Sequence, residues 1–510
     1  MSEVKSGAVL AYTNVVISNI VALLYTPIVV RILGQGNYGV YKLCDSVVAS
    51  LSLLSLGFGT AYVRFYARLK VARDDQGIAN LNGLYIALFT AVSALACFGG
   101  WGLMAASPRL FDSTLSYEEI DLAKTLILIM TGNIVVTFLS SVFSSYILVH
   151  ERFRWIYSVA LLMKILGPLL GVGTLLAGWG AIGAAATVLC ISLFSLLWNV
   201  VYSVKKLGMK FHLSISGSIH LGEIVVFSAW VFLTQIFNIL TDNVPNFILA
   251  ARAGSVDVAI FAIAFQIRQM FSTLSTALSG VFTPRINTLV ANNKGNKSLL
   301  QLMIQVGRYQ LVLHLMLFGG FLLVGKYFIQ IWVGEGYELS YWIAVVLSFV
   351  VVVPLIQNIG IQIQQAKNMH KFRSIAYLLS AIGGVIISWL MVPSYGAIGA
   401  TVGYCFIVVT STWIAMNWYY HFRIKLDMKV YWQAMMPILG TGVTVTGAFA
   451  IVTYVFPVNS LLHFTVIGGL FSCLYALSIW HFALSLQEKQ QLRELIYHIP
   501  FVGRRIHPDE

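Results

Sequence analysis

The stretch GWGAIGAA, residues 178–185, returns as SYGAIGAT, residues 394–401, and this pair of turns decides the fold. The two copies are 216 residues apart. A basic triplet upstream of each copy, RFR at 152–154 and KFR at 371–373, repeats with an offset of 219. Each triplet opens an apolar run, and each glycine-alanine turn joins that run to the next one. The sequence therefore predicts an internal duplication of helices.

The runs around these turns are long enough to be membrane spans. Of the 510 residues, 58% are hydrophobic and 10% are charged, against roughly 25% charged in soluble proteins, and the mean hydropathy is +0.83. Too few polar residues remain to cover the surface of a water-soluble fold, which is excluded. As helices, fourteen runs can cross about 30 Å of hydrocarbon, near residues 8–30, 43–63, 83–105, 125–149, 156–177, 181–204, 224–250, 258–284, 309–325, 341–363, 374–392, 397–420, 434–456 and 461–484.

The offsets also predict the architecture. Runs four to six correspond to runs ten to twelve, and LGQGNYGVY from Leu33 aligns more weakly with AGSVDVAIF from Ala253 at an offset of 220. Six helices per repeat is an even number, so the halves have parallel orientation and a pseudo-twofold axis along the membrane normal. We predict an all-α polytopic membrane protein of 14 transmembrane helices, with six-helix lobes at 1–210 and 211–425. Residues 426–510 hold two C-terminal helices and a cytoplasmic amphipathic tail, whose helix is expected at 487–499.

The basic residues follow the predicted loops. The formal net charge is +13. With the amino terminus assigned to the cytoplasm, 24 of the 32 basic residues fall in inside segments and six in outside loops, as the positive-inside rule requires. These residues therefore indicate topology and not a nucleic-acid surface, and both termini are expected in the cytoplasm.

No catalytic, cofactor or metal site is predicted. The five cysteines stand alone in apolar runs, which supports neither a disulfide framework nor a metal site. Residues 34–39 match GxGxxG, but membrane spans flank them where a nucleotide site needs a strand and a helix, so we expect a flexible turn. Residues 320–326 match GxxxxGK, but Tyr327 replaces the Ser or Thr that would bind Mg²⁺.

A few charged residues lie within the predicted spans, where they normally face a watery cavity or a partner. Arg268 and Lys164 are near the midplane and are predicted to line a cavity. Arg31 and Arg64 are close enough to an interface to anchor a helix, and are also candidates for binding cargo. Asp45, near the outer end of the second span, is a candidate for coupling transport to an ion.

Asp242 is the second candidate for ion coupling. It precedes Asn243 and Pro245 in the outer part of the seventh span. It could pair with Arg252 or Arg268, help to break the helix before the proline, or titrate during a transport cycle.

Several segments carry a family resemblance. RILG at 31–34, YGVY at 38–41 and LGFGTA at 56–61, followed by Arg64, resemble the opening of Wzx-type polysaccharide flippases. WVGEGY at 332–337 and YGAIGA at 395–400 resemble the second half of the same family, in the multidrug/oligosaccharidyl-lipid/polysaccharide (MOP) exporter superfamily. The resemblance covers roughly residues 7 to 420.

This resemblance implies a transporter and not an enzyme. Alternating access would carry an undecaprenyl-diphosphate-linked oligosaccharide from the inner to the outer leaflet of the bacterial cytoplasmic membrane, for cell-surface polysaccharide assembly. Midplane cations suit an anionic diphosphate, and the polyprenyl tail can stay among the membrane lipids. A proton or sodium gradient and polysaccharide polymerase machinery are candidate partners.

Three alternatives remain open. A lipid II flippase of peptidoglycan synthesis presents a similar anionic headgroup. A multidrug and toxin extruder carries cations, which the two midplane cations oppose but Asp45 and Asp242 allow. A polytopic glycan polymerase or ligase needs an external catalytic loop, and the longest outer loop, residues 107–124, is short for one.

Overall fold

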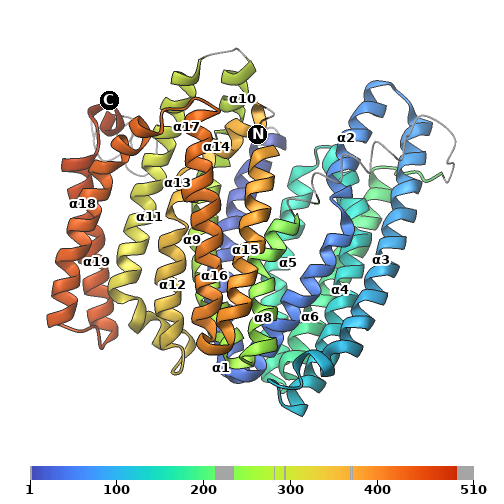
Figure 1. The fold of residues 1–510 in the computed structure, drawn as a ribbon. Coiled ribbons are helices and arrows are strands. Elements are labelled where there is room, and N and C mark those ends of the chain that lie inside the picture. The colour runs from blue at the N-terminus through green and yellow to red at the C-terminus, as the bar shows by residue number, and fades with distance from the viewer. Residues whose placement is uncertain are drawn as a thin grey trace, which may run out of the picture. The chain divides into compact units, whose positions relative to one another are not determined.

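The computed structural model describes residues 3–212, 232, 235–280, 282–291, 295–367, 369 and 371–490. Every regular element in this part of the chain is a helix (Figure 1). Ten helical stretches among these residues are long and apolar enough to cross a membrane. The prediction of an all-α polytopic membrane protein is confirmed. The count of fourteen spans and the division into two lobes stay predictions.

The chain forms two compact units. Unit 1 comprises Met1–Met270, Trp332–Leu347 and Lys371–Ser411, and unit 2 comprises Phe271–Ile331, Ser348–His370 and Thr412–Glu510. The helices that lie wholly in unit 1 are α1 (Glu3–Ala49), η1 (Ser50–Ser55), α2 (Phe58–Val71), α3 (Asp75–Phe111), α4 (Tyr117–Val149), α5 (Phe153–Leu176), α6 (Gly180–Val201), η2 (Tyr202–Lys206), α8 (Val244–Arg252), α15 (Lys371–Tyr395) and α16 (Ala397–Val408).

Unit 2 contains the carboxy-terminal helices. Its own helices are α10 (Thr283–Ala291), α13 (Val352–Ile356), α14 (Asn358–Ala366), α17 (Asn417–Phe422), α18 (Met428–Val455), α19 (Leu461–Ser478) and η4 (Ile479–Ala483). Four helices continue from one unit into the other: α9 (Ser255–Gly280), α11 (Asn296–Val333), α12 (Glu338–Val350) and η3 (Val409–Met416).

Arg308 of α11 connects three segments of unit 2. Its Nε and Nη2 donate to the two carboxylate oxygens of Glu488, at 2.6 and 2.9 Å. Nη2 also donates to the carbonyl of Ala483 at 2.6 Å, and Nη1 donates to the carbonyl of Ala434 in α18. Because the ion pair is buried and bidentate, removing either partner leaves a charge that nothing neutralises.

The two matched turns have matched geometry. The basic triplets lie at the starts of α5 and α15, and each glycine-alanine turn joins its helix to the next one. Gly180 and Gly396 immediately precede or begin the second helix of each pair, with φ of 54° and 52°. These values favour glycine because a Cβ is strained in this region. The two matched glycines thus share a positive φ, while the division into two lobes stays a prediction.

A second pair of glycines, Gly384 and Gly403, lies where α15 and α16 approach each other closely. A Cβ added at Gly384 of α15 would lie 2.6 Å from the carbonyl oxygen of Gly403 in α16. Small residues let membrane helices pack at such distances.

The predicted turn at residues 34–39 is wrong in its extent. The helix α1 runs through this stretch, and only Gly34 has non-helical angles, with φ 72° and ψ 171°. A single glycine can adopt this conformation without strain, so a kink replaces the expected loop.

Two predicted spans are interrupted. The run 43–63 continues from α1 into η1, and Leu56 and Gly57 then take positive φ before α2 begins. The run 341–363 is divided among α12, α13 and α14. Other predictions lie partly outside the described residues: much of the seventh span, 224–250, and the tail helix beyond Gln490.

Candidate functional site

Arg268 lies in a polar and aromatic cluster of unit 1. It projects from α9, and its guanidinium carbon is 4.9 Å from the ring centre of Phe265 and 5.2 Å from that of Tyr404 in α16. Its Nη1 donates to Oε1 of the exposed Gln269 at 2.8 Å. The side chain is half-buried, so the cation is held by aromatic faces and still reaches a surface.

Asp242 is the acidic member of this cluster. Its carboxylate interacts electrostatically with Arg268. The helix around it is interrupted at Asn243, and α8 starts at Val244 with Pro245 in its first turn. The proline and the break therefore coincide, as the sequence predicts. The alternative cation, Arg252, stacks over the ring of Trp389 at 4.1 Å.

Polar contacts tie α1 to this cluster and its surroundings. Gln266, two residues before Arg268, donates from Nε2 to Oγ1 of Thr26 at 2.7 Å. Asn246 donates from Nδ2 to Oγ of Ser46 at 2.8 Å. These side chains come from the two predicted lobes, and they meet within unit 1.

Asp45 lines a separate small cavity in unit 1. The cavity has a volume of about 290 Å³ and lies among α1, η1, α4 and α6. Asn133 and Thr137 of α4 also line it, and Oδ1 of Asn133 is buried with no hydrogen-bond partner among the described residues. Lys42 forms an ion pair with Asp45, with 3.8 Å between Nζ and Oδ2. The carboxylate is thus already next to a cation.

The remaining predicted cations, Lys164, Arg31 and Arg64, are exposed side chains of unit 1. Lys164 is exposed on α5, and it has no hydrogen bond or ion pair with the described residues. Arg31 is exposed near the Gly34 kink of α1, and Arg64 is exposed on α2. The structure therefore brings Arg268 and Asp242 together, and Lys42 and Asp45 together.

The predicted outer ends of the two halves are joined in unit 1. Thr114 donates to the carbonyl of Ala250 at 2.5 Å, and Ser255 donates to Oε1 of Glu119 at 2.5 Å. Gln35 donates to the carbonyl of Gly336 at 2.7 Å. These three hydrogen bonds link the predicted outer ends of the two halves within unit 1.

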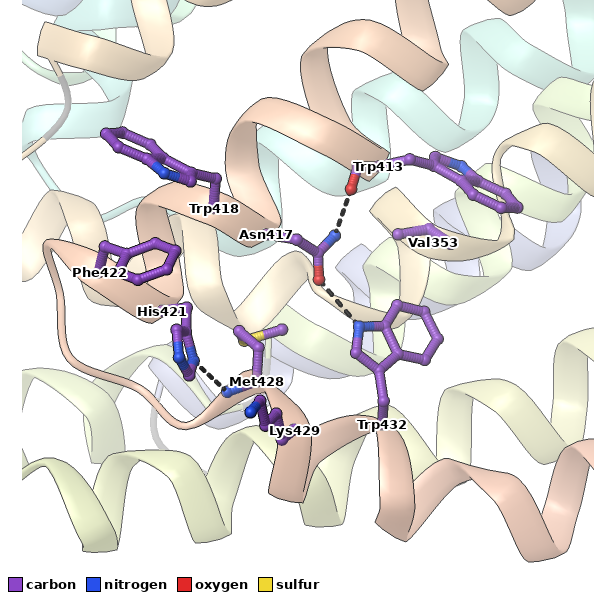
Figure 2. Close-up of a pocket in the computed structure, with 9 residues that line it drawn as sticks. All are labelled: Val353, Trp413, Asn417, Trp418, His421, Phe422, Met428, Lys429 and Trp432. Carbon is purple, nitrogen blue, oxygen red and sulfur yellow. Dashed lines mark hydrogen bonds between the residues drawn. The ribbon is translucent and has the colours of Figure 1, made fainter.

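Unit 2 contains two cavities that were not predicted from the sequence. One has a volume of about 600 Å³ and lies around the turn from α17 to α18 (Figure 2). Its lining includes Trp413, Trp418, His421, Lys429 and Trp432. The other, of about 460 Å³, is apolar and lies along α11, α12, α13 and α18. The sequence does carry a signal for the larger cavity, because Trp418 and Trp432 flank a basic turn.

A family model described as "Polysaccharide biosynthesis protein" matches residues 4–290, more than half of the chain. The chain belongs to this family. The matched range includes Arg268, Asp242, Asp45 and Lys164. Against curated proteins the sequence has no significant match.

Solved transporters share the fold of this member of the polysaccharide biosynthesis family. The lipid II flippase MurJ in an inward closed conformation has a TM-score of 0.71 at 16% identity, covering 93% of this chain and 98% of MurJ. An inward-facing MATE family multidrug resistance transporter has a TM-score of 0.65 at 15% identity, covering 82% and 98%. A MOP superfamily transporter from Pyrococcus furiosus, whose reversed pocket polarity suggests a different function, has a TM-score of 0.51 at 15% identity, covering 83% and 96%. These similarities show that the chain shares its fold with these transporters.

Proposed function

We propose that this protein is a flippase that moves an undecaprenyl-diphosphate-linked oligosaccharide from the cytoplasmic to the outer leaflet. Membership of the polysaccharide biosynthesis family supports the cargo class. The observation that carries the proposal is the half-buried Arg268 guanidinium, held between Phe265 and Tyr404. A charged residue in a predicted span normally faces a cavity or a partner, and an anionic diphosphate is a suitable ligand for Arg268 beside its contact with Asp242.

The linked outer ends of the two halves support alternating access. The contacts of Thr114, Ser255 and Gln35 join the predicted outer ends of both halves. A carrier with these ends joined receives cargo from the cytoplasm. The cycle then requires these hydrogen bonds to break, so that the cargo leaves toward the outer leaflet.

The second candidate function is lipid II flipping. It is favoured by the similarity to MurJ, which covers more of this chain than the similarity to the MATE transporter. Both candidate cargoes carry a diphosphate, so Arg268 does not distinguish them.

Complementation separates the candidates. The gene is expressed in cells that lack a known polysaccharide flippase and, separately, in cells depleted of their lipid II flippase. We expect surface polysaccharide to return in the first strain and no growth rescue in the second. Rescue of growth alone assigns lipid II as cargo, and rescue of neither strain by a well-expressed protein removes the proposal for those two cargoes.

A further inference from the structure

The two cavities of unit 2 are neighbours and share part of their lining. Val353, Trp413 and Trp432 line both of them. The larger cavity lies at the start of α18, and the apolar one continues along that helix to Ala450. From Trp432 to Ala450 the helix rises roughly 27 Å, at 1.5 Å per residue. Taken together, the two neighbouring cavities extend from the α17–α18 turn along the predicted span to Ala450.

Only a few polar groups in the larger cavity remain available to a ligand. Asn417 donates from Nδ2 to the carbonyl of Trp413, and its Oδ1 accepts from Trp432 Nε1 at 2.9 Å (Figure 2). Its Nδ2 also donates to the carbonyl of Thr412, and its Oδ1 also accepts from Gln357. The indole of Trp413 donates to the carbonyl of Val350. These groups are therefore already satisfied by the protein.

Lys429 and His421 supply the free donors. Nδ1 of His421 accepts the backbone N–H of Met428 at 3.3 Å and lies 4.0 Å from Oδ1 of Asp427, so Nε2 is the ring nitrogen left to meet a ligand. Neither Nε2 of His421 nor Nζ of Lys429 has a hydrogen-bond partner in the described part of the chain. Two donors, one of them cationic, suit a single phosphate group.

The apolar cavity suits a hydrocarbon chain. Its walls include Leu315, Phe318 and Leu322 of α11 and Leu439 and Val443 of α18. Phe349 and Val443, which line the cavity, are 52% and 65% exposed, so this cavity opens to the surface of unit 2. A chain can thus enter sideways while its headgroup stays at the interface.

We propose that these neighbouring cavities bind an anionic phospholipid of the cytoplasmic leaflet, with the phosphate at Lys429 and His421 and an acyl chain in the apolar cavity. The turn that carries Arg423, Lys425 and Lys429 is predicted to be cytoplasmic, and basic pockets between helices on that side bind anionic headgroups. This lipid is separate from the proposed cargo, which Arg268 of unit 1 would bind.

Other ligands fit less well. A sugar needs several hydrogen-bond partners, and the protein already uses those of Asn417, Trp413 and Trp432. A cationic headgroup, which the indoles alone would favour, is repelled by Lys429. An oligosaccharide diphosphate carries more charge than one lysine balances, and its glycan exceeds a cavity of about 600 Å³.

The headgroup is tested by titrating the delipidated full-length protein in native mass spectrometry. The probes are phosphatidylglycerol and phosphatidylcholine with identical acyl chains. We expect tighter binding of phosphatidylglycerol, and a roughly fivefold weakening of it in Lys429→Gln. Arg423→Gln, which removes an exposed cation of the same turn that does not line the cavity, should bind both lipids like the wild type. Equal binding of the two lipids, or no effect of Lys429→Gln, overturns the proposal.

The acyl chain is tested by filling the apolar cavity. Gly447 lines it, and an added Cβ meets no atom within 4 Å, so Gly447→Leu should fold and occupy the space. Gly440→Leu is the control, because Gly440 is equally open but lies outside the cavity. We expect only Gly447→Leu to weaken phospholipid binding. Unchanged binding in Gly447→Leu overturns the chain assignment.

A third probe distinguishes this site from a cargo site. If undecaprenyl phosphate binds more tightly than phosphatidylglycerol and depends on Lys429, the cavity is a cargo site and the proposal fails. The complementation result for the proposed function does not depend on that outcome.

Discussion

At the scale of single residues, the cations of this protein act in different ways. Arg308 is 9% exposed, and Glu488 and two backbone carbonyls accept its hydrogen bonds. Arg268 is half-buried, and two aromatic rings flank it. Arg308 is therefore a structural residue, while part of the Arg268 side chain stays exposed and can contact a ligand.

Replacing Glu488 tests the structural role. Glu488→Gln leaves the buried guanidinium without a counter-charge, and we expect a loss of about 3 kcal/mol in the free energy of unfolding. Glu335→Gln, at an exposed carboxylate, should change it little. Chemical denaturation of the purified protein measures both variants, and equal stability of the two would contradict the structural role.

The same ion pair predicts a pH dependence. Burial raises the pKa of Glu488, but hydrogen bonds from Arg308 and Ser485 outweigh burial, and the pKa lies below its ordinary value of 4.5. The pair therefore stabilises the fold fully above about pH 4.5, and this contribution is lost as the pH falls through the lower folded-state pKa. Acidification below that range should destabilise the wild type more than Glu488→Gln.

Arg268 is predicted to act on transport and not on folding. Arg268→Ala should reduce flipping roughly 10- to 100-fold, as expected for losing a charged hydrogen bond, while the protein still accumulates in the membrane. Arg268→Lys should retain more activity because it keeps the charge, though not a bidentate contact. Transport is measured by exposure of the glycan at the outer leaflet. Full transport by an Arg268→Ala, Lys164→Ala double variant would remove both cations from the mechanism.

At the scale of helices, the duplicated turns provide a matched pair. Asp257 accepts the backbone N–H of Ala397 at 2.7 Å and so caps α16. A Cβ at Gly396 would lie 2.3 Å from that carboxylate oxygen, whereas one at Gly180 has only Leu33 near it, at 3.9 Å. The two glycines share their φ values but differ in their neighbours.

Replacing each glycine by alanine should separate the cost of backbone strain from the cost of losing the Asp257 contact. Gly180→Ala places a Cβ at a positive φ, which adds backbone strain of about 1 kcal/mol. Gly396→Ala also places a Cβ at a positive φ and in addition displaces the cap, for a total of about 2 to 3 kcal/mol. Thermal unfolding of the two purified variants measures the difference. Equal losses would show that Asp257 contributes nothing to α16.

At the scale of the whole molecule, the orientation in the membrane is testable. Cys97, Cys190 and Cys473 are exposed, so all native cysteines are first replaced. An impermeant thiol reagent added to intact cells should then label cysteine introduced at Asp112 and not at Lys297. The reverse pattern would invert the predicted topology.

Coupling of transport to an ion gradient is a second property of the whole molecule that can be tested. If Asp242 changes its proton or sodium affinity between the two access states, Asp242→Asn should accumulate normally but lose gradient-driven transport. If Asp242 only fixes Arg268, the variant should accumulate less protein. Normal accumulation and an unchanged response to both gradients would exclude the coupling role.

Much of the fold could be predicted because its causes are local. Apolar runs of sufficient length indicate spans, and Pro245 indicates the break that precedes α8. The Gly34 kink could not be distinguished from a loop, since glycine permits both. The interruption at Leu56 and Gly57 was missed because an apolar run looks the same in α and 3₁₀ geometry.

The membrane class and the glycine-alanine turns could be predicted from the sequence, because hydropathy and repeated motifs are properties of contiguous residues. Which distant side chains meet could be seen in the folded chain alone. Tyr404 lies over Arg268, and Glu488 pairs with Arg308 across 180 residues of chain. The neighbouring cavities of unit 2 likewise depend on how α11, α13 and α18 pack. Such contacts follow from side-chain shape and packing in three dimensions, which no local pattern encodes.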